Sequence, residues 1–152
     1  MNFEKQQYIT IEDVLSQAHT LISYNDARIL LQHVLKINHA HIITHPEQSL
    51  TPIQIHTFQL LVKRRASGEP ISYILGECEF YSIKFKVTPS VLIPRQETEL
   101  LVDLALEKVS SSMSCKILDL GTGSGVIAIT IAKHRTLSNV TAADNSADAI
   151  AI

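Results

Sequence analysis

Apolar residues in the first half of the chain recur three and four positions apart, the spacing of short helices. Thr10 can cap a first helix, and Asn25 or Asp26 can start a second. Thr51-Pro52 predicts a third start, because a capping hydroxyl precedes a proline at the first helical position, and Gly68 predicts its end. The apolar residues expected to face inward are Val14, Ala18, Leu21, Ile22, Ile29, Leu30, Val34, Leu35, Ile55, Phe58, Leu61 and Val62. Residues 1–75 are therefore predicted to form a small α-helical bundle.

After Gly76 the hydrophobic period becomes two. Aromatic and β-branched residues alternate with Lys84 and Lys86, which predicts a β-hairpin linker over residues 76–90. Pro89 and Pro94 bound an extended loop, and a helix is expected from about Glu97. The predicted apolar stripe of this helix is Leu100, Leu101, Leu104, Ala105 and Val109.

The period changes again from Lys116. Residues 117–120 predict a short buried strand, and residues 121–125 predict a glycine-rich turn. A helix is expected over residues 126–134 and a second strand over residues 140–143, with Ser146 opening another helix. Strand, turn, helix and strand predict a right-handed βαβ unit of a parallel sheet. Residues 91–152 are thus predicted to be the first part of an α/β domain.

Composition and charge limit the possible functions. The 152 residues are 45% hydrophobic, enough for a packed core, and 13 Lys and Arg against 15 Asp and Glu give a net charge of −2. This balance argues against nucleic acid as a direct partner, since phosphate binding needs a basic surface. Cys78 and Cys115 match no zinc or redox spacing and are expected to be reduced thiols. Without an apolar signal core or a membrane-length apolar stretch, a soluble cytoplasmic protein is expected.

The segment from Asp119 to Gly125 reads Asp-Leu-Gly-Thr-Gly-Ser-Gly. Dinucleotide-binding turns carry glycine at the first, third and sixth positions, where a pyrophosphate reaches the helix N-terminus. Here Val126 occupies the sixth position and glycine recurs at the fifth. The pattern here, an acidic residue that closes a strand and is followed by G-x-G-x-G, instead resembles that of S-adenosylmethionine-dependent methyltransferases. The predicted cofactor-binding residues are Gly121, Thr122, Gly123, Ser124, Gly125 and Asp144.

Asp144 ends the second predicted strand, about 20 residues after the turn. A carboxylate offers two acceptor oxygens, which suits the two vicinal hydroxyls of a ribose. The alternative is that Asp144 only caps the following helix.

Three further segments carry a family resemblance. Residues 68–76 read Gly-Glu-Pro-Ile-Ser-Tyr-Ile-Leu-Gly and lead into Glu-Phe-Tyr at 79–81. Residues 91–99 read Val-Leu-Ile-Pro-Arg-Gln-Glu-Thr-Glu, and residues 140–149 read Val-Thr-Ala-Ala-Asp-Asn-Ser-Ala-Asp-Ala. From Arg64 onward the chain resembles the release-factor glutamine methyltransferases, also called the HemK family.

The resemblance implies a five-helix domain that helps hold the release factor, a β-hairpin, and a Rossmann-like domain that uses S-adenosylmethionine. The family methylates the amide nitrogen of the glutamine in the Gly-Gly-Gln motif of peptide chain release factors. The resemblance gives the cofactor positions to residues 121–125 and Asp144. It also implies a loop near the pocket that contains Pro94, Arg95, Thr98 and Glu99.

The family signature Asn-Pro-Pro-Tyr does not occur in the 152 residues. In the family its Asn and a proline carbonyl hold the amide nitrogen, a poor nucleophile, in line with the methyl group. No catalytic residue is therefore assigned. The chain is expected to be a monomeric fragment of a longer enzyme and inactive alone.

Other polar residues have simpler interpretations. His39, His41, His45 and Glu47 match no zinc spacing, so no metal site is expected. Arg95 either positions substrate or pairs with Glu97 or Glu99, which otherwise favour the first turn of a helix. Lys63-Arg64-Arg65 suits a helix end, and Tyr73 is expected in the core.

Two other functions compete with the methylation of release factors. An amino-methyltransferase acting on nucleic acid shares the cofactor unit, although the near-neutral charge disfavours it. A non-catalytic module that binds a partner through residues 1–75 is the third hypothesis.

Overall fold

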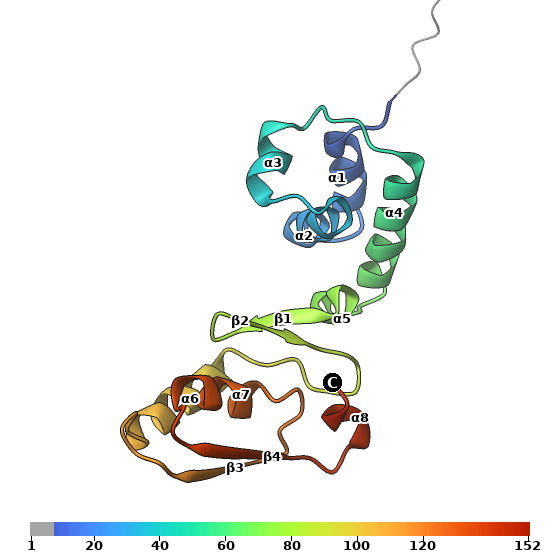
Figure 1. The fold of residues 1–152 in the computed structure, drawn as a ribbon. Coiled ribbons are helices and arrows are strands. Elements are labelled where there is room, and N and C mark those ends of the chain that lie inside the picture. Colours follow the sequence, from blue (N-terminus) through green and yellow to red (C-terminus); the bar gives the residue numbers. More distant parts are fainter. Residues whose placement is uncertain (1–7) are drawn as a thin grey trace, which may run out of the picture. The chain divides into compact units, whose positions relative to one another are not determined.

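The computed structural model describes residues 8–152 and divides the chain into two compact units, with the boundary between Leu75 and Gly76 (Figure 1). Residues 1–7, the start of the predicted bundle and of the region without a signal core, lie outside the described residues. The described part of the N-terminal unit contains five helices, as the resemblance implies. They are α1 (Ile11–His19), α2 (Tyr24–Leu35), α3 (His39–Thr44), α4 (Pro52–Ala66) and α5 (Ile71–Leu75).

The helix starts at Thr10 and Thr51 are confirmed, and each is a reciprocal capping box. The Thr10 side chain accepts from the backbone N–H of Asp13, and the Asp13 carboxylate accepts from the backbone N–H of Thr10. Thr51 and Gln54 repeat this exchange at α4. The second helix starts at Tyr24, earlier than predicted, because Ser23 is its cap. Helices α3 and α5 have six and five residues and are too short to display a hydrophobic period.

The core of the N-terminal unit draws on α1, α2 and α4, with Ile11, Leu30, Leu31 and Phe58 almost wholly buried. The prediction that Leu21 faces inward is wrong. Helix α1 ends at His19, so Leu21 no longer follows the helical period and is 63% exposed.

The C-terminal unit contains an antiparallel hairpin and a parallel pair of strands. The hairpin pairs Glu77 with Lys86 and Phe80 with Ile83. The parallel strands run in register, with Asp119 opposite Ala142. The elements are β1 (Glu77–Phe80), β2 (Ile83–Lys86), α6 (Glu97–Lys108), β3 (Lys116–Leu120), α7 (Val126–His134), β4 (Asn139–Ala143) and α8 (Ala147–Ile150). The predicted fold class, a helical bundle followed by a hairpin and the start of a parallel α/β domain, is confirmed.

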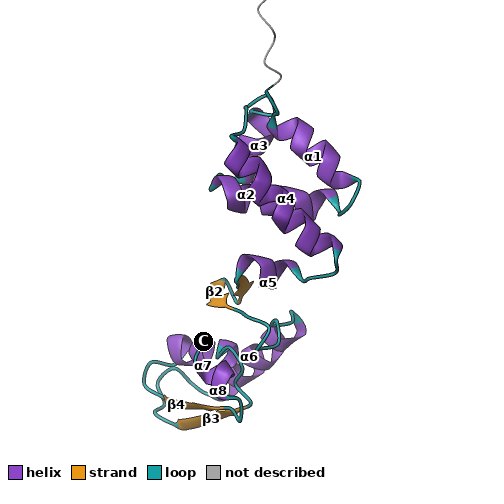
Figure 2. Cartoon of the chain, turned by 90° about the vertical axis from the view of Figure 1, so that its right-hand side faces the viewer, coloured by secondary structure: helices purple, strands orange, loops and turns teal. Residues whose placement is uncertain are grey.

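Helices α6 and α7 lie on one side of the β3–β4 sheet in two views at right angles (Figures 1 and 2). Helix α7 contacts both strands, and α6 packs on α7. Val102, which is fully buried, joins α6 to a cluster with Phe80, Phe85, Val126 and Ile131. The hairpin, two helices and the sheet therefore share one core within this unit.

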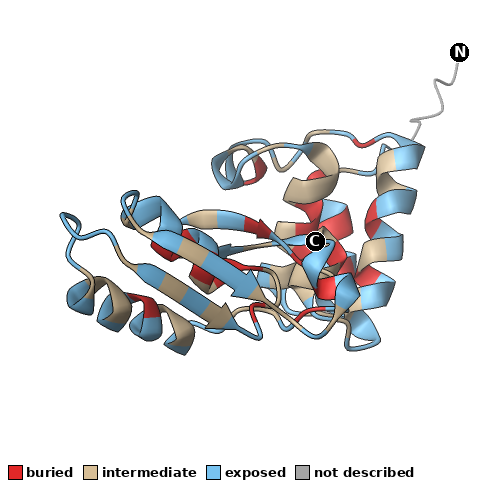
Figure 3. Cartoon of the chain, turned by 60° about the horizontal axis from the view of Figure 1, so that its bottom comes forward, coloured by how far each residue is buried: buried red, intermediate tan, exposed pale blue. Residues whose placement is uncertain are grey.

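Two predictions about burial in this unit are wrong. The strand β3 was expected to be buried, but Leu118 is 59% exposed and Leu120 is 74% exposed, and neither strand contains a buried residue (Figure 3). A parallel strand is buried on both faces only when helices cover both, and within residues 8–152 α7 covers one. On α6, the expected stripe residues Leu100, Leu101 and Leu104 are exposed because the helix turns Val102, Ala105 and Leu106 toward the core.

Candidate functional site

The glycine-rich turn lies where β3 ends, beside the end of β4. The backbone N–H groups of Gly121 and Thr122 both donate to the carbonyl oxygen of Ala143, at 2.8 and 3.0 Å. These bonds join the turn to the last residue of the neighbouring strand. The carboxyl edge of a parallel sheet is where α/β proteins bind ligands.

Asp119, at the end of β3, holds the turn against α7. Its Oδ2 accepts from the Thr122 hydroxyl at 2.7 Å and from the backbone N–H of Ala128 at 3.2 Å. The sequence identified Asp119 only as the acidic residue that closes the strand. A threonine three residues later was the signal for this role, since its hydroxyl can reach back to the carboxylate.

Asp144 ties the turn to the segment that follows β4. Its Oδ2 accepts from the backbone N–H of Gly123 at 2.8 Å, and its Oδ1 accepts from the backbone N–H of Ser146 at 2.9 Å. The bonds from Ser146 and then Gly123 lower the pKa of Asp144, so the carboxylate is ionised at neutral pH. A carboxylate has about four lone-pair sites, so each oxygen can accept one further hydrogen bond.

The alternative that Asp144 is only a helix cap is wrong. The cap of α8 is Ser146, whose hydroxyl accepts from the backbone N–H of Ala149 at 3.2 Å. Asp144 instead accepts hydrogen bonds from two backbone N–H groups, that of Ser146 at the start of α8 and that of Gly123 in the glycine turn.

The three glycines of the turn all have positive φ: 75° at Gly121, 56° at Gly123 and 76° at Gly125. A Cβ added to Gly121 or Gly123 would meet no heavy atom of the described residues within 4 Å. A Cβ on Gly125 would lie 3.0 Å from Cδ1 of Ile129. The first two glycines therefore leave their backbone open to an approaching ligand, while Gly125 allows the turn to pack on α7.

The remaining two predicted turn residues are also placed by the fold. Thr122 is 8% exposed and uses its hydroxyl on Asp119. Ser124 is half-buried between two glycines of positive φ. The predicted cofactor residues are thus brought together, with Thr122 facing the protein interior.

The loop before α6 borders a polar hollow of about 320 Å³. Pro94, Arg95 and Glu99 line it with Gln96, Glu79 and Phe80, whereas Thr98 does not. Among residues 8–152, Arg95 forms no ion pair with Glu97 or Glu99, so the ion-pair interpretation of Arg95 is wrong.

Glu99 has a partner that the sequence did not predict. Its Oε1 accepts from the backbone N–H of Tyr81 at 2.7 Å, and the Tyr81 hydroxyl donates to Oδ1 of Asp103 at 2.8 Å. The second bond raises the pKa of Tyr81. Tyr81 and Ser82 have φ of 52° and 57°, a left-handed turn usually made by Asn-Gly. Without those residues, the sequence carried no signal for this turn.

Two histidines of the N-terminal unit, His41 and His45, contact each other. His41 and His45 stack with ring centroids 4.3 Å apart, and Nε2 of His41 lies 2.6 Å from Oε1 of Gln48. Within residues 8–152, no three His, Cys, Asp or Glu side chains are grouped to hold a metal ion. No helix in the described part of the chain is long and apolar enough to cross a membrane.

Comparison with known proteins identifies the class first. Residues 95–152 match the family model described as the methyltransferase small domain. The C-terminal unit, with its parallel strands, glycine turn and following acidic residue, therefore resembles the start of a methyltransferase domain. Residues 8–76 match the model described as the PrmC N-terminal domain.

Individual relatives identify the family. The chain is 46% identical over 141 residues to the release factor glutamine methyltransferase of Coxiella burnetii, covering 91% of this chain and 51% of that protein. It is 44% identical to that of Shewanella oneidensis, covering 84% and 44%, and 41% identical to that of Vibrio cholerae, covering 90% and 50%. The chain belongs to the release factor glutamine methyltransferase family, and it spans about half the length of the curated relatives it matches.

Proposed function

We propose that this chain provides the cofactor site and the partner-binding domain of an S-adenosylmethionine-dependent methyltransferase that modifies a glutamine of peptide chain release factors. The names of its relatives support the substrate. The observation that carries the cofactor proposal is the open turn of Gly121 and Gly123, fixed by the ionised Asp144.

The residues present fit an adenosine cofactor. The unused lone pairs of Asp144 can accept hydrogen bonds from the two ribose hydroxyls while the carboxylate keeps its bonds to Gly123 and Ser146. Asp119 keeps Thr122 and the start of α7 in place, so the turn needs little rearrangement on binding. The cofactor supplies a methyl group on a sulfonium, an electrophile for the substrate nitrogen.

The proposed substrate atom is the side-chain amide nitrogen in the Gly-Gly-Gln motif. Its lone pair is delocalised into the carbonyl, so transfer requires acceptors that position its N–H groups. The 152 residues contain no Asn-Pro-Pro-Tyr sequence to supply them. We therefore assign cofactor binding but no methyl transfer to a polypeptide of these residues alone. Its place of action would be the cytoplasm, as a monomer, with a protein rather than a nucleic acid as substrate.

Calorimetric titration of the chain with S-adenosylmethionine tests the cofactor site. Saturable binding is expected, and Asp144→Asn should weaken it by at least about tenfold, because one acceptor oxygen becomes an amide donor. Asp148→Asn, which removes a carboxylate in the first turn of α8, is the matched control and should bind as the parent chain does.

A ligand change separates ribose contacts from damage to the turn. Adenosine and 2′,3′-dideoxyadenosine can be compared as competitors of S-adenosylmethionine. If Asp144 accepts hydrogen bonds from the ribose hydroxyls, the dideoxy compound should be a weaker competitor than adenosine for the parent chain. The two compounds should compete equally well for the Asp144→Ala variant. The same preference in both proteins would show that Asp144 does not hold the ribose.

A further inference from the structure

The parallel sheet of the C-terminal unit has one face that packs on helix α7 and one that does not. Ile117 of β3 and Val140 of β4 pack against the core of the unit, and Asp119 accepts a hydrogen bond from the backbone of α7. Because side chains alternate along a strand, Leu118 and Leu120 project from the opposite face. Figure 3 looks onto the two strands, and none of the described helices crosses in front of them. One face of the sheet is therefore open within the described residues.

This open face is largely apolar. Leu118 and Leu120 are 59% and 74% exposed, and the strand register places Thr141 and Ala143 beside them on β4. Lys116, at the start of β3, is the one charged residue that the two strands contribute to this face. Parallel sheets normally have helices on both faces, so leucines at these positions indicate a face that a further element covers.

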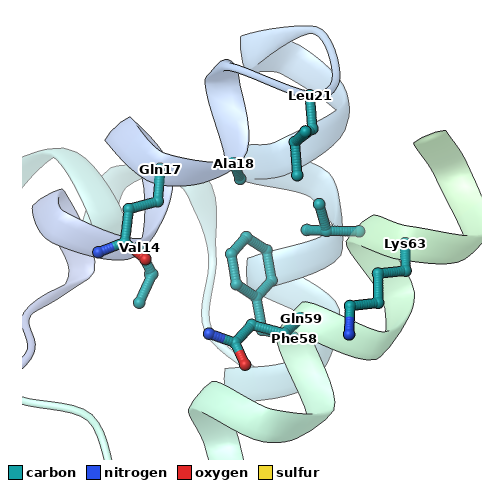
Figure 4. Close-up of a pocket in the computed structure, with 8 residues that line it drawn as sticks. Val14, Gln17, Ala18, Leu21, Phe58, Gln59 and Lys63 are labelled. Carbon is teal, nitrogen blue, oxygen red and sulfur yellow. The ribbon is translucent and has the colours of Figure 1, made fainter.

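The apolar hollow between α1 and α4 of the N-terminal unit differs from the open sheet face. Figure 4 shows the Phe58 ring projecting from α4 into the space beside α1. Phe58 and Val62 are between 1% and 4% exposed, so their apolar surface is already buried in the helical core. Leu118 and Leu120 have no such cover among the described residues. The sheet face is therefore the stronger indication of a missing neighbour.

The length of the relatives indicates what covers this face. The chain spans 51%, 44% and 50% of the three relatives, so each of them has about as many residues again outside the matched segment. The match to the methyltransferase small domain runs from residue 95 to residue 152, and this segment contributes two parallel strands. Sheets of globular proteins usually have about four to six strands. The region of the relatives that this chain does not span is therefore the natural source of a helix for the open face.

We propose that the face of Leu118 and Leu120 is the docking surface for that region, whether the region is joined to the chain or supplied as a separate polypeptide. An amphipathic helix of the region lies across β3 and β4 with its apolar stripe on the two leucines. Each of the two strands has a single neighbour in the described sheet, so an unpaired edge is available for a further strand of the same region. The inference depends on the family membership and not on the proposed cofactor or substrate.

The first test co-expresses the full chain with the part of the Coxiella burnetii relative that follows the matched segment. The two polypeptides should co-purify in a 1:1 ratio, and sedimentation measures their affinity. Leu118→Thr and Leu120→Thr remove apolar surface but keep a residue that favours strands, and each should weaken the association about tenfold. The matched control is Leu137→Thr, because Leu137 is 58% exposed in the same unit but lies outside both strands. This control should associate as the parent chain does.

A second test does not require the added part to fold alone. It uses a single-chain chimera in which residues 1–152 are followed by the same part of the relative. In the chimera, Leu118→Thr should lower the midpoint of thermal unfolding by about 3 °C, because the leucine is now buried. In the chain alone, where Leu118 is exposed, the same substitution should have little effect. Leu137→Thr should have little effect in both proteins.

Two results would overturn the inference. Equal effects of Leu118→Thr and Leu137→Thr in the chimera would show that the added region covers another face, whether or not the separate polypeptides co-purify. A dimer of the chain alone that Leu118→Thr abolishes would show that the face belongs to a second copy. Neither result bears on the proposed function, which the titration with S-adenosylmethionine tests separately.

Discussion

Both units of the chain have a buried core, but in the described residues only the C-terminal unit has a sheet with an uncovered face. In the N-terminal unit, helices enclose a core in which Leu30 and Leu31 are fully buried. In the C-terminal unit, the parallel sheet leaves Leu118 and Leu120 exposed, and two carboxylates hold the turn at its edge. The comparison indicates that burial maintains the helical unit, whereas hydrogen bonds to Asp119 and Asp144 shape the glycine turn of the C-terminal unit.

The largest expected effect is the loss of stability when a buried side chain of the N-terminal unit is removed, compared with an exposed side chain of the C-terminal sheet. Phe58→Ala removes a side chain that is 1% exposed, and it should destabilise the N-terminal unit by about 3–5 kcal/mol. Leu118→Ala, at a position that is 59% exposed, should cost less than about 0.5 kcal/mol. Amide hydrogen exchange, measured separately for peptides of each unit, reports both values. A loss of protection with Leu118→Ala comparable to that with Phe58→Ala would contradict the comparison.

The next effect separates two glycines of the same turn. Gly125→Ala places a Cβ on a residue with a φ of 76°, which costs about 1–2 kcal/mol of backbone strain. The added Cβ would also lie 3.0 Å from Cδ1 of Ile129, closer than an ordinary van der Waals contact. Gly123→Ala has a similar backbone cost but meets no described atom within 4 Å. We expect Gly125→Ala to lower stability more, and Gly123→Ala to lower affinity for S-adenosylmethionine while the unit stays folded. Thermal unfolding and calorimetry measure the two quantities, and the reverse ranking in either would refute the division of roles.

A smaller effect tests a helix start in the N-terminal unit. Thr51→Ala should cost about 1 kcal/mol, because the Thr51 hydroxyl no longer accepts from the backbone N–H of Gln54. Thr51→Ser keeps the hydroxyl and is the matched control. Faster exchange in the first turn of α4 is expected only for the alanine variant, and equal exchange in both variants would exclude the cap as a source of stability.

Helix starts were the part of the fold that the sequence predicted best, because their signals are local. Thr10 and Thr51 each need only a partner three residues away, and both caps occur as predicted. The exposure of Leu21 and Leu118 was not predictable in this way. Whether an apolar residue is buried depends on which distant element covers it, and the local sequence around the residue does not indicate that element.

The candidate site divides in the same manner. The positions of Gly121, Gly123 and Asp144 at one sheet edge follow from the order of strand, turn and strand, which the sequence displays. The hydrogen bond from the Tyr81 N–H to Glu99 joins residues 18 positions apart, beside a turn in which Tyr81 and Ser82 have positive φ. No local sequence pattern predicts this bond. The two acceptor roles of Asp144 toward backbone N–H groups likewise depend on the folded turn.

The smallest expected effect is on stability in acid, and it again differs between the units. The pKa of Asp144 is lowered by the N–H groups of Ser146 and Gly123, and the pKa of Asp13 is lowered by its backbone and side-chain bonds to Thr10. A carboxylate with a depressed folded pKa stabilises the protein fully above its unfolded value, near 3.9, and this stabilisation is lost as the pH falls through the folded pKa. Asp144→Asn should therefore reduce the acid sensitivity of exchange in the C-terminal unit alone. Asp13→Asn should do so in the N-terminal unit alone. A pH dependence that shifts in both units with either substitution would mean that the two units unfold together, and that their separate means of stabilisation act as one.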